Sequence, residues 1–139
     1  MGSKDCNCTV TLDMAKQIVH AAKDEASTNK WSMVIVVVDN GGHMVAMERM
    51  DGAFLGAIDV AHAKARTAIM FKRPTKAYDD MMGDEYPGAR LLSNPEICPF
   101  EGGVPIMLND EIIGAVGVSG SAPPNDGQVA EVGAKAISG

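Results

Sequence analysis

The feature that most constrains this 139-residue chain is an apolar, mostly β-branched run from Met33 to Val38 that ends at Asp39-Asn40-Gly41-Gly42. Such a run is typical of a strand buried on both faces, because no polar residue alternates with the apolar ones. Asn-Gly is a strong signal for a tight hairpin turn. The sequence therefore predicts a strand over 32–39 that turns back into a strand over 43–50, and so an antiparallel sheet.

Helical periodicity and turn residues predict the rest of the fold. Thr11 is expected to cap the first helix, and Pro74 to close the second, because the residue before a proline avoids the helical conformation. Asn109-Asp110 predicts the turn of a second hairpin, and Asp126 is expected to cap the last helix. In chain order we expect helix, hairpin, helix, irregular segment, hairpin and helix, over 11–29, 32–50, 55–71, 75–100, 103–118 and 126–137. The irregular segment has room for one or two short helical turns. Two hairpins joined by helices indicate an α+β fold, with the helices packed on one antiparallel sheet.

Length and charge limit the class of protein. The length suits a single domain over 11–139, after a flexible lead-in over 1–10. The chain has 12 Lys and Arg residues against 18 Asp and Glu, a net charge of −6, and no cluster of positive charge. Nucleic acids and anionic membrane surfaces attract concentrated positive charge, so we expect neither as a partner. No apolar run approaches the roughly 20 residues that a membrane span needs.

Cysteine content and the apolar elements predict compartment and assembly. The 3 cysteines are an odd number, which suits a reducing compartment, and we expect a cytoplasmic protein. Cys6 and Cys8 lack the second Cys or His pair that would complete a zinc site. A wholly apolar strand and alanine-rich helices predict that the chain buries further surface by self-association, as a homo-oligomer.

The first group of candidate site residues follows the second strand and continues on the second helix. Arg49 and Asp51 stand at the end of the strand, where an arginine can clamp a ligand carboxylate. The alternative is an Arg49–Asp51 ion pair that only fixes the turn. Lys64 lies among alanines, where a lysine can anchor an anion. His62 and Arg66 are expected on a solvent-exposed face of the same helix.

A second group lies at and before the second hairpin. Glu101 can act as an acid or base where it is buried, and the backbone amides of Gly102 and Gly103 can bind an anion. A plain turn that leads into the strand would explain the same residues. Tyr86 is a candidate for proton transfer and Cys98 for ligand contact, both within the irregular segment.

These two groups are expected to converge at one site, under a roof formed by residues 78–100. At such a site Glu101, Tyr86 or Asp51 would move protons. Arg49 and backbone amides would hold the developing negative charge. Such a site would suit isomerisation, elimination or a retro-aldol-type cleavage, because each of these reactions needs only proton transfer and a site for the oxyanion. The chain has no phosphate loop and no dinucleotide fingerprint, which argues against kinases and dehydrogenases.

His20 is the candidate metal ligand. It lies on the first predicted helix, between Val19 and Ala21. A neutral imidazole is a common metal ligand and can be an axial ligand of heme iron. The alternative is a surface histidine, or one with a protein partner.

Three segments of the chain carry a family resemblance. They are Val38 to Ala46 followed by Arg49 to Ala53; Ala61, Lys64, Ala65, Thr67, Ala68 and Phe71 followed by Pro74-Thr75; and Gly102-Gly103, Pro105-Ile106, Ile113 to Gly120 and Asp126. In this order and spacing they resemble the GlcG/HbpS family, which includes the C-terminal domain of PduO-type proteins. The resemblance covers residues 11–137.

The resemblance implies a profilin-like fold in α/β/α layers around a five-stranded antiparallel sheet, and commonly a homo-oligomer. It implies binding of heme or a similar planar ligand as the default function, with heme as the cofactor and a first-helix histidine on the iron. His20 lies on the corresponding helix. Two hypotheses therefore stand: a small-molecule binding protein, or an isomerase- or lyase-type enzyme without a nucleotide cofactor that acts on a small anionic or carbonyl-bearing substrate.

Overall fold

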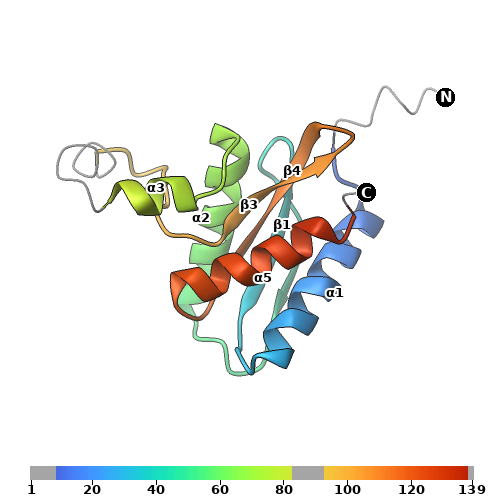
Figure 1. Cartoon of the computed structure of the whole chain (residues 1–139), viewed down its shortest axis with the longest axis vertical. Coiled ribbons are helices and arrows are strands. Elements are labelled where there is room, and N and C mark those ends of the chain that lie inside the picture. The colour runs from blue at the N-terminus through green and yellow to red at the C-terminus, as the bar shows by residue number, and fades with distance from the viewer. Residues whose placement is uncertain (1–8, 83–92, 138–139) are drawn as a thin grey trace.

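The computed structural model of the chain describes residues 9–82 and 93–137 (Figure 1). Its elements are α1 (Leu12–Thr28), β1 (Val34–Asp39), β2 (Met44–Arg49), α2 (Gly56–Phe71), α3 (Lys76–Met81), β3 (Gly103–Leu108), β4 (Glu111–Ser119) and α5 (Pro123–Lys135). This is the predicted order of helix, hairpin, helix, irregular segment, hairpin and helix, and α3 is a short helix of the kind expected within the irregular segment. The α+β fold class is confirmed.

The sheet is antiparallel throughout, in the order β2-β1-β4-β3. β1 is central, and its residues from Val34 to Val38 are all buried, as the apolar run predicts. The resemblance implied five strands, but the described residues form four. Val10 adds one backbone hydrogen bond, from its N–H to the carbonyl of Ile113 at 2.9 Å, which is too little pairing for a further strand. Val10 is nevertheless buried, so the last residue of the expected lead-in belongs to the core.

The hairpin between β1 and β2 is confirmed. Asp39 organises its turn: the carboxylate Oδ1 accepts hydrogen bonds from the backbone N–H groups of Gly41 and His43, each at 2.9 Å. Gly42 has a φ of 86°, which glycine adopts at little cost. β2 begins at Met44, so His43 belongs to the turn. The turn at Asn109-Asp110 is also confirmed.

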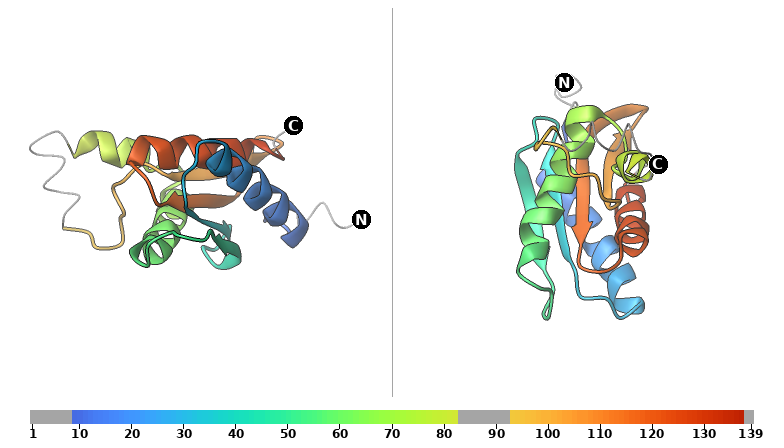
Figure 2. Two further views of the ribbon diagram at one scale, coloured as in Figure 1. Left: turned by 90° about the horizontal axis from the view of Figure 1, so that it is seen from below. Right: turned by 90° about the vertical axis from the view of Figure 1, so that its left-hand side faces the viewer.

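The sheet lies between two helical layers (Figures 1 and 2). α1 and α5 cover one face, and α2 covers the other. The helices contribute mainly alanines to the core; Ala57, Ala61, Ala65 and Ala68 of α2 are fully buried against β1 and β4. Small side chains let the helix and sheet backbones approach closely, so that only one layer of side chains fits between them.

The last helix begins earlier than predicted. α5 starts at Pro123, and its first turn holds two prolines. Proline suits this position because it has no backbone N–H, and the first N–H groups of a helix have no acceptor within the helix. Asp126 therefore does not cap this helix. It lies within the first turn, almost wholly buried, and accepts a hydrogen bond from the Ser121 N–H at 3.0 Å.

The described residues before β3, 93–102, run beside α2 to the sheet. Thr67 of α2 holds this segment, since its hydroxyl oxygen accepts a hydrogen bond from the Cys98 N–H at 3.0 Å. Thr75 then brackets the start of β3: its N–H donates to the Gly103 carbonyl at 2.9 Å, and its hydroxyl accepts from the Gly103 N–H at 2.8 Å. No helix within the described ranges is long and apolar enough to cross a membrane.

Candidate functional site

A buried ion pair joins the two helical layers through the end of the sheet. Lys64 of α2 and Asp126 of α5 are 1% and 2% exposed, and Lys64 Nζ lies 2.9 Å from Asp126 Oδ2. The same ammonium donates a hydrogen bond to the carbonyl of Val118 on β4 at 3.0 Å. Burial acts to raise the pKa of Asp126, while the nearby ammonium acts to lower it, and the net effect is upward. An isolated buried charge is very unfavourable, so each of these groups depends on the other.

Glu101 lies beside this pair, and two glycines leave the space that is needed: Gly127 for the Glu101 carboxylate and Gly102 for the Lys64 side chain. A side chain on Gly127 would collide with the Glu101 carboxylate, and a Cβ on Gly102 would lie 2.8 Å from Lys64 Nζ. The Glu101 backbone N–H donates to Asp79 Oδ2 of α3 at 2.8 Å. The structure thus brings together Lys64, Glu101 and the two glycines that follow it, as the sequence predicted.

The Glu101 carboxylate is chemically distinct from other carboxylates of the site. Among the described residues it makes no hydrogen bond or ion pair. Burial raises its pKa above the ordinary value, and the nearby Asp79 and Asp80 act in the same direction, against Lys76 and Lys64. An unpaired carboxylate of raised pKa is a stronger base than an ordinary carboxylate and is suited to proton transfer.

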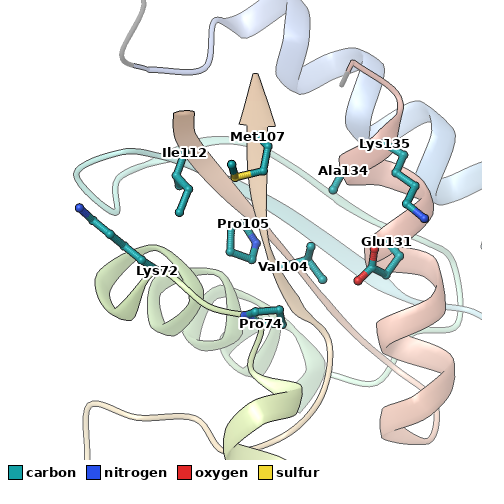
Figure 3. Close-up of a pocket in the computed structure, with 9 residues that line it drawn as sticks. All are labelled: Lys72, Pro74, Val104, Pro105, Met107, Ile112, Glu131, Ala134 and Lys135. Atoms are coloured by element: carbon teal, nitrogen blue, oxygen red, sulfur yellow. The ribbon is translucent and has the colours of Figure 1, made fainter. Parts of the chain in front are cut away.

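Two adjoining hollows run along the edge strand β3. The larger has a volume of about 420 Å³. Figure 3 shows its lining: Lys72, Pro74, Val104, Pro105, Met107, Ile112, Glu131, Ala134 and Lys135. The smaller, of about 290 Å³, shares Pro74, Val104 and Glu131 with it and has Glu101, Gly102 and Gly103 in its wall. We call this smaller space the Glu101 hollow.

The other predicted members of this site lie elsewhere. Arg49 is exposed on the edge strand β2, paired with Val34, so that β1 and β4 separate it from β3. Asp51 is exposed in the turn that follows, and the ion pairs of the described residues include neither Arg49 nor Asp51. Both sequence interpretations of these two residues, a ligand clamp at the Glu101 hollow and a turn-fixing pair, therefore lack support in the geometry. Tyr86 lies outside the described residues.

Cys98 and His62 occupy the α2 side of the molecule. Cys98 is partly buried, and burial raises the pKa of its thiol, against the nearby positive charge of Lys64. His62 is not on a fully solvated face, because its Nε2 is buried and has no hydrogen-bond partner among the described residues. Arg66 donates a hydrogen bond to the Gly42 carbonyl at 3.2 Å, so it too has a structural contact.

A separate hollow lies between α1 and β2, on the opposite side of the sheet from α2. It has a volume of about 500 Å³, and we call it the α1/β2 hollow. Its lining is Leu12, Lys16, Val19, His20, Lys23, Ala46, Met47 and Glu48. Ala46 pairs with Val37 of β1, whose side chain belongs to the core under α1 and α5. The small side chain of Ala46 thus faces α1, and it leaves open the space that a larger residue would fill.

His20 stands in this hollow with an accessible imidazole. Its side chain is 73% exposed, and Nε2 lies 3.3 Å from Asp24 Oδ2 one helical turn later. A carboxylate on one ring nitrogen is a common companion of a metal-binding histidine, since it orients the ring. His20 and the Glu101 hollow are therefore two distinct candidate sites, on α1/β2 and on β3/α5.

Comparison with known proteins decides the family. Residues 10–135 match the family described as haem degrading protein HbpS-like. The chain belongs to the HbpS-like family. The resemblance predicted from the three sequence segments is confirmed.

Individual relatives support the same assignment. Protein GlcG of Escherichia coli strain K12 is 40% identical over 110 residues, which cover 79% of this chain and 81% of GlcG. The crystal structure of protein ORFY from Klebsiella pneumoniae has 32% identity and a TM-score of 0.84, over 91% of this chain and 89% of that one. A crystal structure of a PduOC:heme complex has 26% identity and a TM-score of 0.82, over 93% and 95% of the two chains.

Sequence reasoning missed several residues of both sites. Asp126 was assigned a capping role, and its pairing with Lys64 crosses 62 positions of sequence. Lys16 and Lys23 flank His20 at helical spacing, which the sequence does display, but only the packing of α1 on β2 shows that all three line one hollow of this HbpS-like chain.

Proposed function

We propose that this HbpS-like protein binds heme in the α1/β2 hollow, with His20 as the ligand of the iron. The observation that carries the proposal is the accessible His20 imidazole in a hollow with apolar walls from Leu12, Val19 and Ala46. Its volume of about 500 Å³ lies in the range of small-molecule sites. The relative crystallised as a heme complex supports the same ligand class.

The residues of the hollow fit the chemistry of heme. Imidazole is an ordinary axial ligand of heme iron, and an apolar wall suits the face of a porphyrin ring. Asp24, 3.3 Å from His20 Nε2, would orient the imidazole. Heme, when bound, supplies an iron centre for ligand binding or electron transfer.

A hemin titration followed by absorbance tests this proposal. Wild-type protein should give a saturable Soret band, and His20→Ala should lose it or bind far more weakly. His43→Ala is the matched control, because His43 is also exposed and also lies 3.3 Å from a carboxylate oxygen, that of Asp39. If His20→Ala and His43→Ala bind hemin as the wild type does, His20 is not the iron ligand. If the wild type shows no saturable band, the proposed function fails.

A second candidate function is acid–base catalysis at the Glu101 hollow. The observation that favours it is the unpaired, partly buried carboxylate of Glu101 in the wall of a hollow of about 290 Å³. Such a group can take a proton from a small carbonyl-bearing substrate and return it at another atom, as an isomerase or lyase requires. A carbon-13 NMR titration of the side-chain carboxyl tests its premise. A Glu101 that titrates with the exposed glutamates would remove this candidate.

A further inference from the structure

We infer that Lys16 and Lys23 bind the two propionate carboxylates of heme, and that Glu48 competes with the ligand for Lys23. The inference rests on the proposed function and adds a ligand class to it: flat apolar rings that carry free carboxylates. It follows from the charges of the α1/β2 hollow and from their spacing along α1.

The two lysines bracket His20 on one face of α1. Lys16 precedes His20 by one helical turn and Lys23 follows it by one turn, and all three line the hollow. Positions at this spacing lie on the same helix face. Lys16 and Lys23 are about 10 Å apart along the helix axis, at about 1.5 Å per residue. Each carries its ammonium on a flexible stem that can lie along apolar surface.

The two lysines differ in their ion-pair partners. Lys16 makes no ion pair or side-chain hydrogen bond within the part of the chain that the structure describes, so its charge is available to a ligand. Lys23 lies 2.9 Å from Glu48 Oε1 on β2, with the two side chains 39% and 48% exposed. Ion pairs this exposed contribute little to stability, so exchange of Glu48 for another carboxylate is easy.

This arrangement matches the chemistry of heme. Heme is an apolar disc with two carboxylates on one edge. With the iron at His20 and the ring against the apolar wall, a cation on each side of the histidine can meet one carboxylate. The same clamp disfavours a corrinoid with neutral amide side chains, because amides do not neutralise the two ammonium groups. The inference therefore predicts selection for a dicarboxylate over neutral planar ligands.

The test compares hemin with hemin dimethyl ester, which has the same ring and iron but no free carboxylates. Lys16→Ala and Lys23→Ala should each weaken hemin binding about fivefold, the scale of one partly exposed charge contact. The double variant should weaken it by about the product of the two. Binding of the dimethyl ester should be the same in the wild type, in the two single lysine variants and in the double variant. Cyanocobalamin should not displace hemin from the wild type.

Two further variants sharpen the test. Lys76→Ala is the matched control, because Lys76 is an exposed lysine paired with Asp80 at 2.9 Å. It lines the Glu101 hollow beside β3, at the opposite edge of the sheet from β2. This variant should leave hemin binding unchanged. Glu48→Gln keeps the shape of the side chain but removes its charge, and should strengthen hemin binding about twofold, since the competitor for Lys23 is weakened.

Failure of this inference is distinct from failure of the proposed function. If His20→Ala abolishes hemin binding while Lys16→Ala, Lys23→Ala and the double variant bind both porphyrins as the wild type does, the heme site stands and the carboxylate clamp is wrong. Equal losses for hemin and for the dimethyl ester would also overturn the clamp, because the lysines would then act on packing. If wild-type protein binds no hemin, both proposals fail.

Discussion

Lys64 Nζ and Asp126 Oδ2 lie 2.9 Å apart with both side chains almost wholly buried, and this pair joins α2 to α5 across the end of β4. Neither residue is among the described residues that line the Glu101 hollow. Gly102, which directly follows Glu101, lies close to the ammonium, since a Cβ added to it would be 2.8 Å from Lys64 Nζ. Glu101 and Gly102 both line the Glu101 hollow, so the buried pair lies directly behind the wall of that hollow.

Breaking this pair should strongly destabilise the fold. Lys64→Met leaves the Asp126 carboxylate buried without its partner, and Asp126→Ala leaves the Lys64 ammonium buried without its partner. Each should lower the free energy of unfolding by about 3–5 kcal/mol. The double variant Lys64→Met/Asp126→Leu should be less destabilised than the two losses added together, because it leaves no unpaired charge. Urea denaturation at neutral pH measures all three.

The exposed pair Lys76–Asp80 provides the control for that series. Its atoms lie at the same distance of 2.9 Å, but the side chains are 57% and 64% exposed. Lys76→Ala should change the urea midpoint very little. A Lys64→Met variant as stable as Lys76→Ala would show that the buried pair does not hold the layers together.

Glu101 should make stability depend on pH. Burial raises the folded-state pKa of Glu101 above its ordinary value of 4.5. A carboxyl with a raised folded pKa binds its proton more tightly in the native state, so its contribution is fully present below the unfolded pKa and is lost as pH rises through the folded pKa. Glu101→Gln stays neutral and should lose nothing over that interval.

The measurement is the difference in urea midpoint between Glu101→Gln and wild type, from about pH 4 upward. The difference should move in favour of the variant as pH rises, and then level off. Glu111→Gln, on the exposed start of β4, makes the same change of charge outside the Glu101 hollow and is measured alongside as the control. A difference in urea midpoint that does not change with pH would mean that burial does not raise the pKa of the Glu101 carboxyl.

Asp39 should stabilise the first hairpin through its hydrogen bonds. Asp39→Ala removes the acceptor for two backbone N–H groups, those of Gly41 and His43, and should cost about 1–2 kcal/mol. Although burial acts to raise it, the hydrogen bonds from His43 and Gly41 lower the pKa of Asp39 below 3.8. A lowered folded pKa gives stability that is present above the unfolded pKa and is lost as pH falls through the folded pKa.

Asp39→Asn separates the two effects. The amide oxygen still accepts the hydrogen bonds, so this variant should be more stable than Asp39→Ala. It should lack the acid-dependent loss that the wild type shows below about pH 4. Thermal unfolding between pH 3 and 7 measures both differences. Equal stability of the two variants would show that the turn needs no acceptor at this position.

The fold could be predicted from the sequence where its signals are local. The apolar run Met33 to Val38 predicts β1, and the Asn40-Gly41 turn directly after it predicts the hairpin with β2. The strand and the hairpin are both confirmed. The sequence predicts the start of α5 too late. Asp126 is a residue typical of a helix cap, and Pro123, although typical of the first helical position, also suits the loop that precedes the helix.

The sites could be predicted only in part, because both depend on packing between distant segments. The sequence predicts that Lys64 and the Glu101 turn lie together, and they do. It also predicts Arg49 beside them, because Arg49 stands at a strand end. The strand order, which the sequence does not show, puts β2 and β3 on opposite edges of the sheet. Likewise, His20 was recognisable as a ligand type, but not the hollow around it. Self-association and a cytoplasmic location remain predictions from composition, and light scattering tests the first.

Filling the α1/β2 hollow should block heme binding without unfolding the protein. Ala46→Leu adds an apolar side chain that faces α1 from a partly exposed position on β2, where the space is open. Because that side chain would occupy the volume assigned to the porphyrin ring, hemin affinity should fall at least about tenfold, which corresponds to about 1.4 kcal/mol. The urea midpoint should stay near that of the wild type, since the added group removes apolar surface from water without displacing buried atoms. Ile112→Leu, in the larger of the two hollows along β3, is the control and should bind hemin normally. Unchanged hemin binding in a folded Ala46→Leu variant would place the heme outside the α1/β2 hollow, whatever the effect of His20→Ala.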